Sequence, residues 1–285
     1  MDWTPESPRP QAPLSREPYD RWVSPAGDCM AEFHRAEPGY LLRFPGQADF
    51  HVVPAETGEA HAITGWPVPD CQMQQVINLY HNAVQPLLGN HAGGLFLHGS
   101  AVRVEGGEGA IAFLGLSRGG KTTLAGSFAG AGHPFLTEDV IDLRLEGGCY
   151  WLQPKRSKLR LFADSARHLL GADAAIEDED RKQDVEAGSA LPFAEAPAPL
   201  KQIYILGTDH SADLTIRQFT LPEALTALMP HAFVLDVEDK TRLRGHFSRM
   251  ADLSQDIGCY ALDYTRDYAE LPRVMEAILE NYRAS

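Results

Sequence analysis

Short runs of alternating apolar and polar residues mark the first part of the chain. Residues 48–53 follow this pattern, and residues 40–44 form a second short β-like run; both stand between turns that contain Gly and Pro, which predicts two β-strands. Before them, residues 1–18 hold five prolines among polar residues, which is typical of an extended or disordered tail. We therefore expect a disordered Pro-rich tail over residues 1–18 and a small β-rich region, followed by a helix, over residues 19–92.

A helical period replaces the alternation after residue 68. Apolar residues recur at spacings of three and four from Met73 to Leu88, as they do on the buried face of a helix. Asp70 is the predicted N-cap, because its carboxylate can accept hydrogen bonds from the first turn. Pro86 and Gly89 are predicted to end the helix. We interpret this apolar stripe as core packing rather than as a ligand site.

Beyond residue 92 the pattern changes between strands and helices, which predicts an α/β domain over residues 93–285. Residues 173–189 are acidic and mixed, which is typical of a solvated, mobile segment. The predicted strands are 95–104, 110–114, 134–136, 140–145, 201–206 and 257–262, and the predicted helices are 122–129, 164–171, 222–229 and 271–282.

The overall charge narrows the classes of partner. The 285 residues carry a formal net charge of −14, so broad contact with nucleic acid or with an anionic membrane is not expected. The four cysteines are scattered without a C-x-x-C pair, which argues against a zinc site and a disulfide framework and fits a reducing cytosol. No secretory signal pattern and no long apolar run occurs, so we expect a cytoplasmic protein without a membrane span.

The segment from Gly115 to Thr122 fits the phosphate-binding pattern G-x-x-x-x-G-K-[ST] and stands between a predicted strand and a predicted helix. Its glycines let backbone N–H groups surround an anion, and the helix N-terminus adds partial positive charge. Lys121 is expected to reach the β- and γ-phosphates and Thr122 to bind Mg²⁺, so ATP and Mg²⁺ are the expected cofactors. A glycine-rich turn without a ligand is the alternative. The residues expected to hold the nucleotide are Gly115, Ser117, Arg118, Gly119, Gly120, Lys121, Thr122 and Thr123.

An acidic pair, Glu138 and Asp139, follows the next predicted strand, where parallel-sheet topology would bring carboxylates beside bound phosphates. One carboxylate can bind Mg²⁺ directly or through water, and the second can accept the proton of an attacking hydroxyl. Thr122, Glu138 and Asp139 are therefore the predicted metal site. A solvated pair of turn residues is the alternative.

Two further features are less specific. His98 lies near the end of a predicted strand, where a histidine is more often a hydrogen-bonded structural residue than a catalyst. A basic cluster spans residues 155–160, and its Lys158 and Arg160 are the predicted clamp for nucleotide or substrate phosphate. A solvated loop explains the cluster equally well. The sequence contains no [NT]-K-x-D guanine signature and no G-x-S-x-G elbow, which disfavours GTP and a serine hydrolase.

These residues together resemble the C-terminal family of HPr serine kinase/phosphorylases. They look still more like the HPr-kinase-related proteins of peptide-modification clusters, which include lasso-peptide precursor kinases. The resemblance implies a P-loop kinase core of the HPr kinase (PEP carboxykinase-like) type over residues 93–285, with the small β-rich region before it. The segments that carry the resemblance are Arg43–Phe50, Leu97–Val102, Gly115–Thr122, Gly132–Asp139 and Lys158–Ser165.

The resemblance also assigns roles to individual positions. It makes Asp139 the general base, gives Lys121 and Thr122 to phosphate and Mg²⁺, and makes His98 a residue of the catalytic site. Asp139, His98 and Lys121 are thus the expected catalytic residues.

Three departures limit what the resemblance implies. Glu138 stands where the family usually has Asp, and its longer side chain can alter the placement of a metal. Arg118-Gly119-Gly120 stands where the bacterial HPr kinases usually have S-G-x-G, which adds a cation to the loop. The N-terminal region does not resemble that of the HPr kinases, so HPr is a poor candidate acceptor. A homo-oligomer stays open, without the family's hexamer being implied.

The sequence therefore favours an ATP-dependent kinase that transfers the γ-phosphate to a serine-type hydroxyl of a peptide or small protein, such as a lasso-peptide precursor. Positioning and charge neutralisation would provide most of the catalysis. Two alternatives stay open: a nucleotide-binding regulatory protein without phosphotransfer, and a kinase of a small metabolite.

Overall fold

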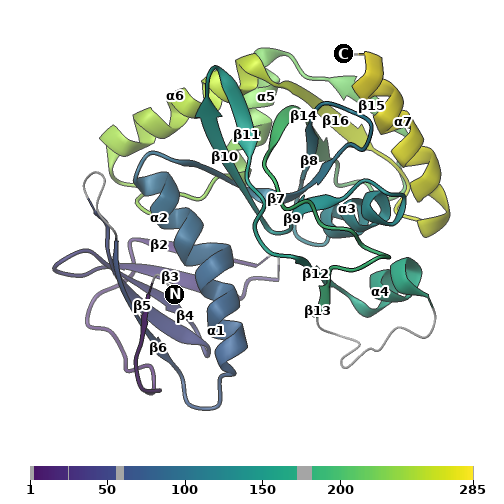
Figure 1. The fold of residues 1–285 in the computed structure, drawn as a ribbon. Coiled ribbons are helices and arrows are strands. Elements are labelled where there is room, and N and C mark those ends of the chain that lie inside the picture. Colours follow the sequence, from purple (N-terminus) through teal and green to yellow (C-terminus); the bar gives the residue numbers. More distant parts are fainter. Residues whose placement is uncertain (1–2, 25, 56–60, 172–181, 285) are drawn as a thin grey trace. The chain divides into compact units, whose positions relative to one another are not determined.

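The chain is a mixed α/β protein with several sheets, and residue contacts divide it into two compact units (Figure 1). Unit 1 comprises Met1–Gly94 and Phe233–His246, and unit 2 comprises Leu95–Ala232 and Phe247–Ser285. The computed structural model describes residues 3–24, 26–55, 61–171 and 182–284.

Unit 1 is built on a six-stranded sheet in the order β1-β6-β5-β4-β3-β2, in which β1 is parallel to β6 and the other pairs are antiparallel. Its strands are β1 (Thr4–Pro5), β2 (Asp20–Val23), β3 (Cys29–Arg35), β4 (Tyr40–Phe44), β5 (Ala48–Val53) and β6 (Ala62–Pro67). The strands predicted at residues 40–44 and 48–53 are confirmed as β4 and β5. Leu42 and Phe50 are fully buried, which explains why the alternation is visible in the sequence.

A continuous helical segment lies across one face of this sheet (Figure 1). It consists of α1 (Met73–Leu79), a π-helical turn (Tyr80–Val84) and α2 (Gln85–His91). Two expectations are wrong here. Asp70 has a left-handed φ of 68° and lies outside the helix, whose N-cap is Gln72. Pro86 and Gly89 do not end the helix, because the π-helical turn shifts the hydrogen bonds just ahead of Pro86 and tolerates its missing N–H.

The N-terminal segment packs on the sheet instead of forming the expected disordered tail. Trp3 is only 5% exposed, and its ring lies 5.5 Å from that of Phe50 and 5.8 Å from that of Tyr80. A Cβ on Gly65 would lie 2.5 Å from the Trp3 ring, so only glycine fits where β1 pairs with β6. The buried indole of Trp3 thus anchors strand β1, which the polar and Pro-rich composition of this segment did not predict.

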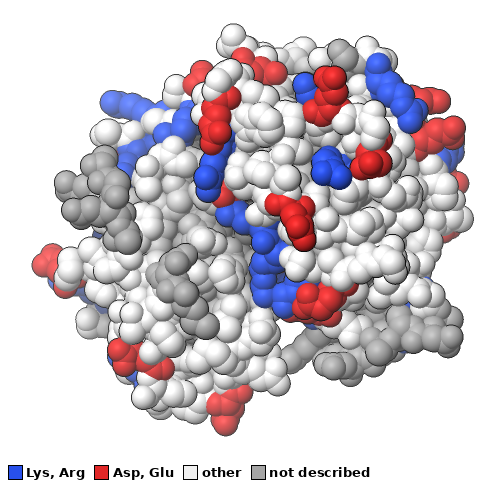
Figure 2. Space-filling view, in the orientation of Figure 1, with Lys and Arg blue, Asp and Glu red and all other residues white. Residues whose placement is uncertain are grey.

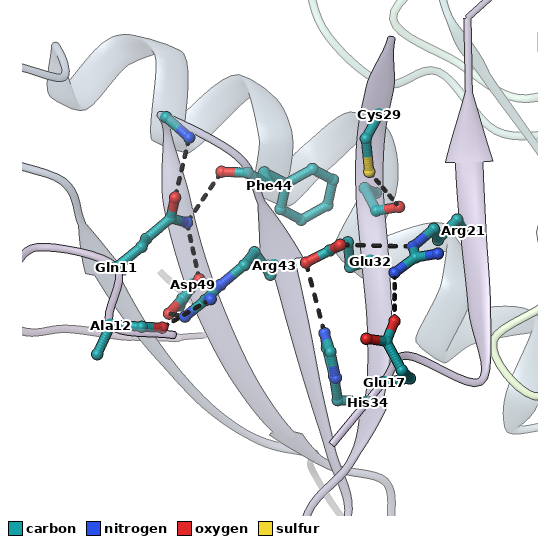
Figure 3. A network of polar contacts seen from close by, with 12 residues as sticks. Gln11, Ala12, Glu17, Arg21, Cys29, Glu32, His34, Arg43, Phe44 and Asp49 are labelled. Carbon is teal, nitrogen blue, oxygen red and sulfur yellow. Dashed lines mark hydrogen bonds and ion pairs between the residues drawn. The ribbon is translucent and has the colours of Figure 1, made fainter. Parts of the chain in front are cut away.

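A buried ion pair joins the β4–β5 hairpin (Figure 3). Arg43 donates from Nε and Nη2 to the two carboxylate oxygens of Asp49, at 3.0 and 2.9 Å. Gln11 donates to Asp49 at 2.8 Å, and Arg43 also donates to the Ala12 carbonyl at 2.8 Å. The network ties residues 11–12 to the hairpin that contains the Arg43–Phe50 motif.

A segment far along the chain completes unit 1. Tyr19 donates to the Leu235 carbonyl at 2.6 Å. Arg35 and Tyr40 both donate to the carboxylate of Asp236, at 2.8 Å in each case. The predicted segments 1–18, 19–92 and 93–285 do not include this return of the chain, because pairing over some 200 residues leaves no local pattern in the sequence.

Unit 2 contains an eight-stranded mixed sheet in the order β11-β10-β7-β8-β14-β16-β15, with β9 paired to β7 and β11 paired also to β14. Strands β8, β14 and β16 are parallel, whereas β7 is antiparallel to β8, β9 and β10. The strands are β7 (Leu95–Arg103), β8 (Ala110–Leu114), β9 (Phe135–Thr137), β10 (Val140–Glu146), β11 (Cys149–Leu152), β14 (Ala198–Leu206), β15 (Thr215–Gln218) and β16 (Gly258–Asp263). A separate two-stranded sheet is formed by β12 (Lys158–Leu161) and β13 (Gln183–Glu186).

Strand β8 is buried on both faces. Ala112 and Leu114 belong to one core cluster of unit 2, and Phe113 belongs to the other, together with Phe128 of α3. This double burial explains the uninterrupted apolar run Ala110–Leu114. The helices are α3 (Lys121–Gly130), α4 (Ala163–Leu170), α5 (Leu221–Leu228) and α7 (Leu271–Ala284), and α6 (Lys240–Asp256) contributes residues to both units. Short 3₁₀ turns lie at Met229–His231 and Tyr268–Glu270.

Every strand and helix predicted beyond residue 92 is present within a few residues of its expected bounds. Helix α6 and the strands β11, β12 and β15 were not predicted from the sequence. Of the acidic segment 173–189, residues up to 181 lie outside the described part of the chain, and Gln183–Glu186 forms β13 rather than a mobile stretch. Among the described residues, no helix has the length and apolar character needed to cross a bilayer.

Candidate functional site

Strand β7 brings the two sequence motifs of unit 2 to the same edge of the sheet. Leu114 at the end of β8 pairs with Gly99, and Thr137 at the end of β9 pairs with Ala101. Because β8 and β9 are both antiparallel to β7, their carboxyl ends point the same way. The acidic pair thus reaches the phosphate loop through an antiparallel strand that lies between them, and not through the parallel neighbour expected from the sequence.

The phosphate loop between β8 and α3 has the backbone that its glycines allow. Gly120 has a φ of 92°, and a Cβ on Gly119 would lie 2.9 Å from the Leu116 carbonyl oxygen. Lys121, the first residue of α3, donates to the Gly115 and Leu116 carbonyls at 2.9 Å each. Burial, and then the charge of Lys182, lower the pKa of Lys121 to about 8. A loop of this shape at a helix N-terminus is suited to bind phosphate.

The loop forms one wall of a cavity of about 840 Å³ that lies within unit 2. Positive charge predominates along its walls even though the whole protein carries −14. Figure 2 shows that the basic residues are not spread evenly on the face drawn, where Lys and Arg side chains gather in a band. The cationic side chains that line the cavity are Arg118, Lys121, Arg160, Arg167, Lys182 and Arg266, against the acids Asp139, Asp164 and Asp267.

The acidic pair is held by groups from three directions. Thr122 donates from Oγ1 to Glu138 Oε1 at 3.0 Å, and Lys182 donates from Nζ to the same oxygen at 3.1 Å. Asp139 forms ion pairs with Lys182 at 3.8 Å and with Arg160 at 3.5 Å. Its backbone is left-handed, with a φ of 65°, and its carbonyl accepts the Gly99 N–H at 3.2 Å. The predicted metal residues Thr122, Glu138 and Asp139 are therefore together.

The two acids differ in protonation. Burial raises the pKa of Glu138, and the neighbouring charge of Asp139 raises it further. Burial alone would also raise the pKa of Asp139, but Lys182, His98 and Arg160 bring it below its usual range. Asp139 is therefore the ionised member of the pair, and it is the one able to accept a proton.

His98 lines the same cavity. Burial, and then the charge of Lys121, lower its pKa to about 4. His98 is therefore neutral near pH 7, so it can orient a hydroxyl or a phosphate oxygen through a hydrogen bond but does not add positive charge.

The chemistry of the site fits Mg²⁺ and a polyphosphate. Mg²⁺ is usually held by one or two carboxylates with water and phosphate oxygens, and Glu138, Asp139 and the Thr122 hydroxyl provide that set. Among the described residues, no group of three or more His, Cys, Asp and Glu that could hold a metal by itself occurs.

Lys158, the other half of the predicted basic clamp, does not line the cavity. Its ammonium group forms an ion pair with Asp184 across the two-stranded sheet. Lys158 and Arg160 are two residues apart on β12 and point to the same side of the strand, but only Arg160 lines the cavity.

Several residues of the site were not predicted. Arg266 donates to the Gly119 carbonyl at 3.2 Å and to the Gly207 carbonyl at 2.9 Å, so it fastens the phosphate loop to the ends of its neighbouring strands. The sequence did indicate Arg266, because it follows the predicted strand that becomes β16. Strand β14 is parallel to both β16 and β8, so the carboxyl ends of these strands lie at the same edge of the sheet. Lys182 had no such signal, since it stands in a segment with acidic composition.

A hydrogen-bonded chain continues the wall beyond the loop. Thr123 Oγ1 and Ser165 Oγ are 2.9 Å apart, and Ser165 Oγ lies 3.1 Å from the Tyr268 hydroxyl. The Tyr268 ring is stacked on His168 with a centroid distance of 4.5 Å. Of these, the sequence predicted only Thr123, because the others come from α4 and from the turn before α7.

Comparisons with known proteins add little to this geometry. No protein-family model and no curated protein sequence matches the chain. Among solved structures, the HPr(Ser) kinase/phosphatase from Coxiella burnetii aligns over 66% of this chain and 90% of its own, with a TM-score of 0.37 and 12% identity. These values are too low to transfer an activity or a residue role to this protein.

Proposed function

We propose that the protein is an ATP-dependent kinase that transfers the γ-phosphate of Mg²⁺-bound ATP to a serine-type hydroxyl. The observation that carries the proposal is the juxtaposition of Lys121 and Thr122 with an ionised Asp139 in one cavity. A protein that only binds nucleotide needs the phosphate loop and one carboxylate for Mg²⁺, whereas Asp139 is a second carboxylate, ionised and able to accept a proton.

In phosphoryl transfer, the protein mainly positions the reactants and neutralises charge. Lys121 would exchange its two carbonyl partners for phosphate oxygens. Thr122 and Glu138 would hold Mg²⁺, which when bound neutralises charge between the β- and γ-phosphates. Asp139 would accept the proton of the acceptor hydroxyl as its oxygen attacks the γ-phosphorus and the bridging oxygen departs with ADP. His98, neutral and beside Asp139, would orient that hydroxyl.

The acceptor we propose is a serine of a peptide or small protein. The support is the resemblance of the Arg43–Phe50, Leu97–Val102 and Lys158–Ser165 motifs to the HPr-kinase-related proteins of lasso-peptide clusters. The kinase core would then be of the HPr kinase type. A metabolite kinase remains the alternative acceptor class, because a cavity of about 840 Å³ holds ATP together with a small alcohol.

The test is mass spectrometry of acceptors incubated with Mg²⁺ and ATP, with the wild type and Asp139→Asn side by side. A serine-ended precursor peptide, HPr and free serine are the acceptors. Asparagine tolerates the left-handed backbone of residue 139, so we expect nucleotide affinity to change little and transfer to fall by roughly 10²–10⁴-fold. Asp252→Asn, the same change at an exposed position of α6, should have no effect.

The outcome separates the classes of function. A phosphate-sized mass gain on one acceptor, absent with Asp139→Asn, supports the kinase and names its substrate. Nucleotide binding without a gain on any acceptor would favour a nucleotide-dependent regulatory protein, and equal transfer by Asp139→Asn would remove Asp139 as the base.

A further inference from the structure

Arg118 occupies a backbone position that disfavours its side chain. Its φ is 63°, in the left-handed region that glycine adopts without strain. An arginine with this backbone has an energetic disadvantage of about 1–2 kcal/mol relative to the right-handed form. Strain of this kind at a candidate site suggests that the side chain itself is needed.

The guanidinium of Arg118 lies over an aromatic ring that Lys182 also contacts. Its Cζ is 5.2 Å from the centroid of Phe162, and the ammonium of Lys182 lies 6.0 Å from the same ring. Lys182 in turn donates to Glu138. Phe162 therefore contacts both Arg118 of the phosphate loop and Lys182, the residue that bonds to the acidic pair.

Arg118 also differs from its cationic neighbours in its partners. Lys121, Lys182 and Arg266 each donate hydrogen bonds to carbonyl or carboxylate oxygens. Within the described ranges, the guanidinium of Arg118 has the Phe162 ring as its contact and forms no ion pair. A cation held over an aromatic ring keeps its hydrogen-bond donors for a ligand.

We infer that Arg118 is an arginine finger provided by the phosphate loop itself, with Phe162 as its positioning residue. The inference rests on the proposed function. As the bond between the γ-phosphorus and the bridging oxygen breaks and the bond to the acceptor oxygen forms, charge builds on the three equatorial oxygens of the transferred group. The guanidinium neutralises that charge through two N–H donors, while the proton goes to Asp139.

Arg118→Gly is the informative variant, because glycine accepts the φ of 63° and the loop should keep its shape. The binding of Mg²⁺·ADP, with and without fluoroaluminate as a mimic of the planar phosphoryl group, is measured by calorimetry. We expect Mg²⁺·ADP to bind within about threefold of wild type and the fluoroaluminate gain to fall by about 100-fold or more. Thermal unfolding should show a stability equal to or above that of the wild type.

Controls distinguish the finger from a general loss of charge. Arg217→Ala removes an exposed cation of β15 and should keep the full fluoroaluminate gain. Arg118→Lys keeps the charge without the fork of donors and should recover only part of the gain. Phe162→Leu should reduce the gain by about three- to tenfold, and Phe162→Tyr should restore it.

The result also separates this inference from the proposed function. A full fluoroaluminate gain in Arg118→Gly overturns the finger and leaves the kinase intact. A wild type that binds Mg²⁺·ADP without any gain overturns the finger as well. A wild type that binds no nucleotide removes the proposed function, and the finger with it.

Discussion

Asp139 combines a buried negative charge with a left-handed backbone, and its neighbours account for both. Lys182 and Arg160 pair with the carboxylate, and the Gly99 N–H holds the carbonyl in place. The combination costs folding free energy, since an unusual backbone and a buried charge are each unfavourable. Such features are retained where chemistry needs them, which is why Asp139 is assigned the role of base.

Lys121 leads to a prediction about pH. Its pKa of about 8 in the nucleotide-free protein means that the ammonium is charged below pH 8 and neutral above it. Phosphate needs the charged form, so we expect the titration of Lys121 to lower the affinity for Mg²⁺·ADP by up to about tenfold for each pH unit above about pH 8. Calorimetry over this range measures the effect.

Lys121→Arg is the control for that pH profile. Arginine stays charged throughout, so the affinity of this variant should be lower and should lack the fall that Lys121 causes above about pH 8. A wild-type affinity that stays constant to pH 10 would show that the charge of Lys121 does not govern binding.

Only part of the site could be predicted at the residue scale. Lys121, Thr122 and the acidic pair belong to local sequence motifs, so their chemistry could be predicted from the sequence. Arg266 and Tyr268 contribute from positions more than 140 residues beyond the loop, and no local pattern indicates where the chain returns. Arg118 was visible as an unusual residue, but only the Phe162 contact shows where its side chain goes.

Strand β7 is the element on which the site depends. It separates β8 from β9 and sets the spacing between the phosphate loop and the acidic pair. Gly99 allows this close approach, because a Cβ there would lie 2.5 Å from Leu114 Cδ2 and 2.7 Å from Ile141 Cδ1. The glycine of the Leu97–Val102 motif is therefore a packing requirement in the middle of the site.

Gly99→Ala should disturb both stability and catalysis. Overpacking is expected to lower the free energy of unfolding by about 1–3 kcal/mol, and the shifted strands should reduce transfer more than nucleotide affinity. Chemical denaturation and the transfer assay measure the two effects. Gly188→Ala, where an added Cβ meets nothing within 4 Å, should change stability by less than about 0.5 kcal/mol. Equal results for the two variants would contradict this account of β7.

Elements with strong periodicity were predicted, and those without it were missed. Helix α7 has one apolar face that packs in the core, and every residue of β8 is buried, so each element has a clear hydrophobic pattern in the sequence. Helix α6 was missed because its sequence pattern is weak. Gly245 has a low helix propensity, and charged residues surround the few buried side chains, such as Met250 and Leu253. The short strands β11 and β15 are specified by tertiary pairing more than by their own composition.

At the scale of the whole molecule, each unit has its own sheet, and the cavity lies within unit 2. The net charge of −14 does not exclude an anionic ligand at this site, because six cationic side chains line the cavity. A total charge describes solubility and long-range attraction, whereas phosphate binding depends on the local field.

The ion pair in unit 1 offers a test of this separation. Asp49→Ala leaves Arg43 largely buried without its carboxylate, so we expect the free energy of unfolding of unit 1 to fall by about 3–5 kcal/mol. Nucleotide affinity, measured below the unfolding transition, should stay unchanged. The double variant Arg43→Met with Asp49→Leu should regain most of the stability. A loss of nucleotide affinity in Asp49→Ala would show that unit 1 contributes to the site.

The most direct test of the central claim is a crystal structure with Mg²⁺ and a non-hydrolysable ATP analogue. The account predicts that the γ-phosphate lies between Lys121 and Asp139, with Mg²⁺ on Thr122 and Glu138. It also predicts room for an acceptor oxygen about 3–3.5 Å from the γ-phosphorus on the side of Asp139. A triphosphate that runs along the loop with its γ-phosphate away from Asp139 would contradict the account, and the acidic pair would then have a structural role.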